Sequence, residues 1–300
     1  MRTLFPMVVV GAVLTGSACR MDFDSQAYIE REEKRFTVDT APVLDVKTFD
    51  GSIEIRSWDR PEVLVEIEKR GQDKDAISKV QVVADQSGPR ISVDVRNSGR
   101  RNFVGIGHFT STSARLIVSL PRKSSVTARS NDGSILLERV DGKIDLRTDD
   151  GSIRVTESAG DLLAESGDGS LTLDDVTGNV EGRTRDGSIR VSGTPNVLRL
   201  RSGDGSISMR IRDNAQMADD WTVTTGDGSV TAELPKGFNA LVNADPGSDG
   251  RVRSDLALTN ATGAGADSKR TRGAVSGQLG AGGKQLTLRT GDGTIRITSY

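Results

Sequence analysis

Residues 132–207 read DGSILLERVDGKIDLRTD, DGSIRVTESAGDLLAESG, DGSLTLDDVTGNVEGRTR, DGSIRVSGTPNVLRLRSG and then DGSI, so one 18-residue unit follows another without interruption. Each unit opens with Asp-Gly-Ser or Asp-Gly-Thr and an aliphatic residue. This tetrad occurs eight times in the chain, with its glycine at Gly51, Gly133, Gly151, Gly169, Gly187, Gly205, Gly228 and Gly293. A fixed period of this size indicates stacked turns, each of which buries its apolar face against its neighbours.

The residues around each tetrad alternate between apolar and polar, which predicts two strands per unit. Ile153 and Val155 follow Gly151 by two and four positions, and Ile144 and Leu146 precede it by seven and five. Such period-two alternation is typical of strands with one face inside. The sequence therefore predicts an all-β protein, a single-chain β-solenoid with about 18 residues and two short strands per turn.

The same parity places a hydroxyl side chain inside, three positions before each glycine. These residues are Thr48, Ser130, Thr148, Ser166, Thr184, Ser202, Thr225 and Thr290. Trp221 also falls at an inward position, where we expect it to fill the core. Trp58 lies at a strand end, where a cap and an exposed contact are equally consistent with the sequence.

Asp-Gly between two strands is a turn signal, because glycine tolerates positive φ and the aspartate can accept hydrogen bonds from nearby amides. A second break, such as Asp141-Gly142, lies half a turn away. The predicted structural-turn residues are Gly133, Gly151, Gly169, Gly187, Gly205 and Gly228. The aspartates beside them would lie one strand spacing apart, at roughly 4.8 Å, and repel one another.

Two hypotheses account for this column of carboxylates, Asp132, Asp150, Asp168, Asp186 and Asp204. In the first, each carboxylate accepts amide hydrogen bonds within its own turn and faces water. In the second, the column binds calcium, which takes several oxygen ligands. The GGxGxD signature of calcium-binding rolls is absent, and no other cofactor is indicated.

The N-terminal segment is typical of an export signal. Residues 1–18 have a short basic start and an apolar run, Leu4 to Leu14, that is too short to span a bilayer. Small residues precede Cys19, the only cysteine, as in bacterial lipoprotein signals, where this cysteine is lipidated. Gly16 stands where leucine is usual, so cleavage after Ala18 by an ordinary signal peptidase also fits. We expect an exported protein, anchored as a lipoprotein at the cell envelope (outer membrane and periplasm, or cell surface).

The remaining chain divides by regularity. We expect a charged tether or one to two helical turns at 19–35, irregular N-terminal β turns at 36–130, and the regular 18-residue-repeat solenoid at 131–232. Residues 233–300 are predicted to form a C-terminal β cap with a Gly/Ala-rich loop at 261–283. Its last turn, Leu286 to Ile297, is expected to close the rod, and residues 36–300 to form one continuous domain.

Composition and motifs argue against several functions. The formal net charge is −2 and aromatic residues make up 4% of the chain, so no basic and aromatic surface for nucleic acid is indicated. The single histidine, His108, stands in a predicted loop, and neither G-x-S-x-G nor a P-loop occurs. No catalytic residue is therefore predicted. An outward column, Arg129, Arg147, Glu165, Arg183 and Arg201, suggests ion pairs between turns or attraction of an anionic polymer.

Three longer segments carry a family resemblance: FDGSIEIRSWDRPEVLVEIEK at 49–69, LIVSLPRKSSVTARSNDGSI at 116–135 and LTLRTGDGTIRI at 286–297. With the lipoprotein-like leader, they resemble the bacterial "putative adhesin" family of β-strand-repeat domains. The resemblance implies a cell-envelope β-solenoid and supplies no catalytic residues.

These observations favour a non-enzymatic binding or scaffold module, held at the membrane by a lipid anchor. Its partner would be an envelope or surface protein or glycan. Two alternatives stay open, a periplasmic or envelope-stress accessory protein and a polysaccharide-acting β-helix enzyme.

Overall fold

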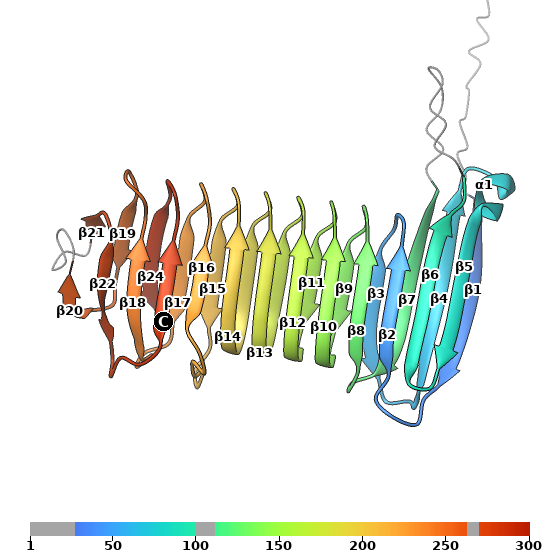
Figure 1. The fold of residues 1–300 in the computed structure, drawn as a ribbon, viewed down its shortest axis with the longest axis horizontal. Helices are drawn as coiled ribbons and strands as arrows, with labels where there is room; N and C mark the ends of the chain where they lie inside the picture. The colour runs from blue at the N-terminus through green and yellow to red at the C-terminus, as the bar shows by residue number, and fades with distance from the viewer. Residues whose placement is uncertain (1–27, 100–111, 263–269) are drawn as a thin grey trace, which may run out of the picture.

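A computed structural model describes residues 28–99, 112–262 and 270–300, which form an all-β solenoid with strands stacked in one long row (Figure 1). Each coil of the solenoid contributes one strand to each of two facing walls. The only helix in the described segments, α1 (Lys74–Ser78), packs at one end. No helix of these segments is both long and apolar enough to cross a membrane.

The first wall contains the strands that lead into the Asp-Gly corners. Its spatial order is β5 (Val80–Ser87), β6 (Arg90–Asn97), β2 (Val43–Thr48), β8 (Ser125–Ser130), β10 (Asp141–Thr148), β12 (Ala159–Ser166), the second halves of β13 (Leu171–Thr184) and β14 (Ile189–Ser202), β16 (Trp221–Thr224), β23 (Gln285–Arg289), β18 (Ala240–Asp245), β22 (Val275–Leu279) and β20 (Thr259–Thr262).

The second wall contains the strands that leave these corners. Its order is β1 (Tyr28–Thr37), β4 (Glu62–Gly71), β7 (Ser113–Pro121), β3 (Ile53–Trp58), β9 (Ile135–Glu138), β11 (Ile153–Thr156), the first halves of β13 and β14, β15 (Ile207–Ile211), β17 (Val230–Leu234), β24 (Thr294–Ser299), β19 (Arg251–Ser254) and β21 (Arg270–Arg272).

The 18-residue period appears directly as strand register. Ile144 in β10 lies beside Val126 in β8 and Leu162 in β12, 18 residues away on either side. The aliphatic residues predicted to face inward are buried, and they form one core that runs along the rod between the walls. Trp221 is completely buried in this core, 5.6 Å from Phe238 between ring centroids, as predicted.

The order of coils departs from the order of the sequence at both ends of the rod. The first Asp-Gly coil, β2 and β3, lies between the later coil β6–β7 and the coil β8–β9. The last one, β23 and β24, lies between β16–β17 and the earlier β18–β19. The expectation that Leu286–Ile297 closes the rod is therefore wrong, because another coil covers it. Antiparallel strands then cap both ends (Figure 1).

Residues 28–35 correct the expected tether. They belong to β1, which pairs antiparallel with β4 along ten residues. Charged side chains join the two strands on both faces: Lys69, on the face of the buried Ile67, lies 3.0 Å from Glu30 and 3.3 Å from Glu32, and Arg31, on the opposite face, lies 2.9 Å from Glu68. A run of alternating charge that suggested a solvated tether or helix is instead an edge strand held by cross-strand ion pairs.

The inward hydroxyl residues link neighbouring Asp-Gly corners. Ser166 Oγ donates a hydrogen bond to the Gly151 carbonyl of the preceding coil at 2.8 Å and accepts one from the Gly169 amide of its own coil at 3.0 Å. Thr184 repeats this between Gly169 and Gly187. The predicted hydroxyl column is thus confirmed as buried, and its role is to satisfy backbone groups that the corner removes from water.

The corner glycines are required for a different reason from the one expected. Of the eight tetrad glycines, only Gly51 has a positive φ, of 128°. A Cβ on Gly169 would lie 2.0 Å from the Gly151 carbonyl oxygen, closer than any real contact. Close backbone stacking excludes a side chain here. Positive φ occurs instead at the second corner, for example 121° at Gly160 and 104° at Gly178.

This distinction predicts different costs for two alanine substitutions. Gly169→Ala should destabilise the protein by about 3 kcal/mol or more, because the methyl group meets backbone that cannot rotate away. Gly237 has a φ of +80° and open space around a Cβ. Gly237→Ala should therefore cost only about 1–2 kcal/mol of left-handed strain. Urea denaturation measures both, and equal costs would contradict the steric explanation.

The attachment of β1 should depend on pH. A hydrogen bond from Lys34 lowers the pKa of Glu32 against the effect of partial burial, and bonds from Arg70 and Arg31 lower the pKa of Glu68. Because both values are lowered, this stabilisation is present above the ordinary carboxyl pKa of 4.5 and is lost as pH falls through the folded values.

Burial lowers the pKa of Lys69, but hydrogen bonds to Glu30 and Glu32 raise it to a net value above 10.5, so its contribution persists until strongly alkaline pH. We expect the hydrogen-exchange protection of β1 to fall relative to β12 in acid. In the Glu32→Gln, Glu68→Gln double variant this step should disappear. An unchanged step would show that other groups hold β1.

Candidate functional site

The structure describes some of the site residues that the sequence predicts, whereas others lie outside the described segments. Cys19 and His108 lie outside the described residues, so lipidation stays a prediction. The corner aspartates are exposed, and the hydroxyl column takes the amide hydrogen bonds expected for them. The idea that each carboxylate accepts amide bonds within its own turn is therefore wrong.

Arg185 supplies the protein contacts of this column. Its Nη2 lies 2.7 Å from Asp168 Oδ1 and its Nε lies 3.9 Å from Asp186 Oδ2. Hydrogen bonding to Asp168 raises the pKa of Arg185 above its ordinary value. No group of three or more His, Cys, Asp or Glu residues within the described part of the chain is placed to hold a metal ion.

Ion pairs hold the outward column of the first wall that contains Arg147, Glu165 and Arg183. One of the two interpretations of this column predicted such pairs. Glu165 lies 2.6 Å from Arg147 and 3.1 Å from Arg183, each one coil away. Arg129 lies 3.9 Å from both Asp45 and Asp145. These exposed pairs balance charge along the first wall.

Trp58 serves as a cap at the end of β3. Its Nε1 donates a hydrogen bond to the Glu62 carbonyl at 2.9 Å, and the Arg60 guanidinium lies 5.0 Å from the ring centroid. The bond crosses the turn between β3 and β4, so the indole fixes this turn.

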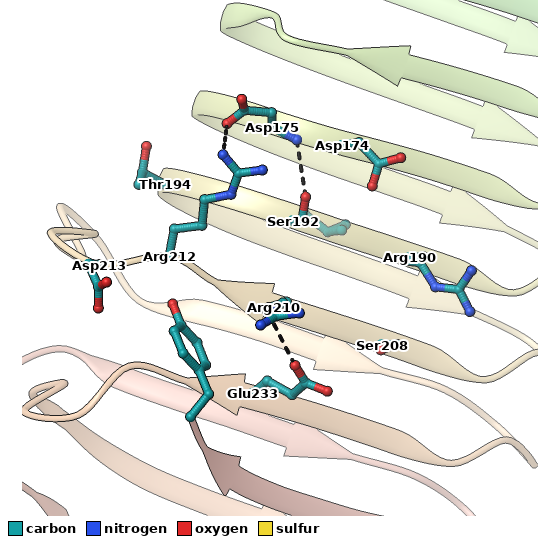
Figure 2. Close-up of a pocket in the computed structure, with 12 residues that line it drawn as sticks. Asp174, Asp175, Arg190, Ser192, Thr194, Ser208, Arg210, Arg212, Asp213 and Glu233 are labelled. Atoms are coloured by element: carbon teal, nitrogen blue, oxygen red, sulfur yellow. Dashed lines mark hydrogen bonds and ion pairs between the residues drawn. The ribbon is translucent and has the colours of Figure 1, made fainter.

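A recess lies on the outer face of the second wall. A groove of about 820 Å³ crosses β13, β14, β15 and β17 and is lined by Asp174, Asp175, Arg190, Val191, Ser192, Thr194, Ser208, Arg210, Arg212, Asp213, Glu233 and Tyr300 (Figure 2). The strand alternation explains the lining: Ile189 and Val191 are buried, so Arg190 and Ser192 point outward. Charged and hydroxyl side chains therefore cover its floor.

Two breaks in the 18-residue repeat form the ends of the groove. A register shift between β13 and β14 sets two residues, Asp174 and Asp175, opposite the single Ser192. Asp175 has a φ of 55°, as the equivalent Arg139 and Glu157 have positive φ in the two preceding coils. The gap from Gly205 to Gly228 is 23 residues, and the additional residues follow β15, where Arg212 and Asp213 stand. The two breaks meet, because Arg212 Nη1 lies 2.8 Å from Asp175 Oδ1 (Figure 2).

Tyr300 closes one side of the groove. Its hydroxyl donates a hydrogen bond to the Ile211 carbonyl at 2.8 Å, and Arg210 lies 5.0 Å from its ring centroid. Arg210 also lies 3.5 Å from Glu233. These contacts hold the aromatic ring and the guanidinium in one arrangement.

Arg190 differs from its neighbours in the groove. It is exposed, and no acidic residue of the described segments forms an ion pair with it. Asp175 and Glu233, by contrast, are paired with arginines. The arrangement offers hydrogen bonds, one free positive charge and one aromatic ring, which suits recognition of a polar ligand.

Sequence reasoning did not find this groove. The 23-residue gap was the available signal, since it marks where the repeat is interrupted. The bulge in β13 carries no comparable signal, because the 18-residue spacing continues across it.

A parallel two-walled solenoid with closely stacked Asp-Gly corners and a polar groove on one wall defines a class of all-β, repeat-built protein. The chain belongs to the Toastrack DUF4097 family, whose sequence model matches residues 43–298. No curated protein matches the chain.

Several solved structures are similar over most of the chain, at low identity. A "putative cell adhesion protein" from Clostridium sporogenes ATCC 15579 shares 12% identity over 91% of this chain and 100% of its own, with a TM-score of 0.29. A "putative adhesin" from Parabacteroides merdae ATCC 43184 shares 12% identity over 89% and 96%, with a TM-score of 0.37. A "putative lipid binding protein" from Parabacteroides distasonis ATCC 8503 shares 8% over 90% and 96%, with a TM-score of 0.34. Similarity at this level carries no argument about function.

The geometry of the aspartate column predicts that divalent cations are not needed for stability. EDTA should leave the Tm unchanged, and millimolar calcium should not raise it, because a lone exposed carboxylate binds calcium weakly. Thermal unfolding of the full-length protein tests this. A calcium-dependent rise in Tm that Asp168→Asn abolishes would contradict the prediction that divalent cations do not stabilise the protein.

Proposed function

We propose that this protein is a non-enzymatic binding or scaffold module of the bacterial cell envelope, and that the groove on the second wall is its binding surface. The observation that carries the proposal is the lining of the groove: exposed arginine, hydroxyl and aromatic groups that hydrogen-bonded strands hold in place. Sites on strands keep their geometry better than sites on loops.

The chemistry of the groove favours binding over turnover. Asp175 and Glu233 are each held by an ion pair with an arginine, so neither carboxylate is free to contact a reacting group. Arg190 and the Ser192 and Thr194 hydroxyls can instead contact carboxylate, hydroxyl or amide groups of a ligand. A polar glycan or an extended peptide from an envelope component fits this set of donors and acceptors.

The envelope location rests on the leader. Residues 1–18 and Cys19 have the pattern of a lipoprotein signal, which would anchor the chain beside its N-terminal segment. β1 lies at one end of the rod and the groove lies towards the other (Figures 1 and 2). An anchor at Cys19 would thus leave the groove away from the attached end.

One experiment separates the adhesin role from the alternatives. A protease-cleavable epitope inserted after Gly237, in an exposed turn, should be cut in intact cells if the protein faces outward. Protection until the cells are permeabilised would contradict the adhesin role and favour the periplasmic accessory protein. Polysaccharide cleavage that Asp175→Asn abolishes would favour the enzyme.

The groove itself is tested by Arg190→Ala. Arg190 has no ion pair within the described segments, so its removal should leave the Tm unchanged. Binding to isolated envelope glycans or proteins should weaken about tenfold, the loss of one charged hydrogen bond. Arg201→Ala on the opposite wall is the matched control and should bind normally. If Arg190→Ala and Arg201→Ala bound equally tightly, the groove would be excluded as the binding surface.

A further inference from the structure

Three arginines lie side by side on the outer face of the second wall, near the end of the rod farthest from β1 (Figure 1). β19 directs Arg251 and Arg253 outward, because Val252 between them is buried. β24 does the same with Arg296, between the buried Ile295 and Ile297. The parallel pairing of β19 and β24 places Arg253 directly beside Arg296.

The neighbouring strand extends the same row. β21 pairs antiparallel with β19, and its register places the backbone of Arg270 beside Arg253 and that of Arg272 beside Arg251. At one register position arginine therefore stands on three adjacent strands, β24, β19 and β21. We call Arg251, Arg253 and Arg296 the arginine row.

The arginine row is not neutralised. Among the residues that the structure places, none of its three members has an ion pair with an acidic side chain, and Arg253 Nε is buried without a hydrogen-bond partner. On the first wall arginines also lie beside arginines, Arg147 beside Arg129 and Arg183 beside Arg201. There, however, Glu165 forms ion pairs with both Arg147 and Arg183. Like charges directly opposite each other destabilise a sheet, and so does a buried donor without a partner. The stability of the fold therefore does not explain why these three unpaired arginines lie together.

We propose that the arginine row is a binding site for an extended polyanion, a chain that bears phosphate or carboxylate groups. A guanidinium presents a fixed fork of donors that binds either group through two parallel hydrogen bonds. Arg253 and Arg296 lie one strand spacing apart, at roughly 4.8 Å, and Arg251 lies two residues from Arg253, about 6.6 Å along β19, so successive anionic groups of one chain can meet successive arginines. A single small anion would neutralise only part of the row, which is why a polymer fits better.

This site is separate from the groove and goes beyond the proposed binding role. The groove arginines Arg210 and Arg212 already have carboxylate partners, whereas the row has none. Arg190 has no ion pair either, but it lies three strands away from Arg296, so Arg190→Ala should leave binding of a polyanion by the row intact. That result distinguishes failure of the groove proposal from failure of this one.

The test uses the full-length protein with four probes: long-chain polyphosphate, polygalacturonate, sodium phosphate alone and phosphatidylglycerol vesicles. The wild type should bind at least one of the two polymers, with an affinity that falls steeply with salt. The triple variant Arg251→Gln, Arg253→Gln, Arg296→Gln should bind that polymer about tenfold or more weakly and with a shallower salt dependence. Arg90→Gln, an exposed arginine without an ion pair at the other end of the rod, is the control and should bind normally.

The Tm is a second readout, and it separates a binding role of the arginine row from a merely structural one. Without ligand, the Tm of the triple variant should equal or exceed that of the wild type, because repulsion is removed. The polymer should raise the Tm of the wild type and of Arg90→Gln, but not that of the triple variant. A lower Tm for the unliganded triple variant would overturn the proposal, since the arginines would then be structural.

Three further results would also overturn it. One is polymer binding by the triple variant equal to that of the wild type. Another is full displacement of the polymer by sodium phosphate at matched phosphate concentration and ionic strength, which would indicate a single-ion site. The last is tighter binding to vesicles than to either polymer, which would assign the row to a lipid surface.

Discussion

The contact between successive Asp-Gly corners governs the rest of the structure. Each corner glycine lies so close to the glycine one coil earlier that a methyl group would overlap its carbonyl, as at Gly169 over Gly151. Such close backbone leaves little room for water, and the hydroxyl of Ser166 or Thr184 satisfies both the carbonyl below and the amide above. Glycine and hydroxyl are therefore one requirement, and together they fix which residues of neighbouring coils lie side by side.

A fixed register aligns the outward side chains into columns, which decides what each face can do. Where the repeat is intact, columns such as Arg147, Glu165 and Arg183 neutralise one another. Where it is interrupted, by the bulge at Asp174–Asp175 and the insertion after β15, the side chains no longer align and a groove forms. Near the end of the rod, Arg253 lies beside Arg296, and no carboxylate of the described residues forms an ion pair with either. The side chains available for binding are thus concentrated where the repeat pattern changes.

The sequence was sufficient for the parts of the fold that depend on local alternation and on the constant period. It predicted the coil, the inward aliphatics, the hydroxyl column and the burial of Trp221. It did not predict the stacking order at the ends, because β2 pairs with β6 and β8 through contacts that no short pattern encodes. It also assigned the corner glycines to positive φ, since a sequence does not reveal how near another backbone comes. The groove was missed for the same reason: its residues come from strands and a loop that meet only after stacking.

The placement of the first and last Asp-Gly coils inside the stack has an evolutionary consequence. Both ends of the rod are finished by dedicated strands, and neither finish touches the coils from β10 to β14. Duplicating one internal 18-residue unit would add a layer of roughly 4.8 Å and present the same corner to its neighbours above and below. The length of the rod can therefore change by whole 18-residue units through recombination within the gene, while the caps and the arginine row stay as they are.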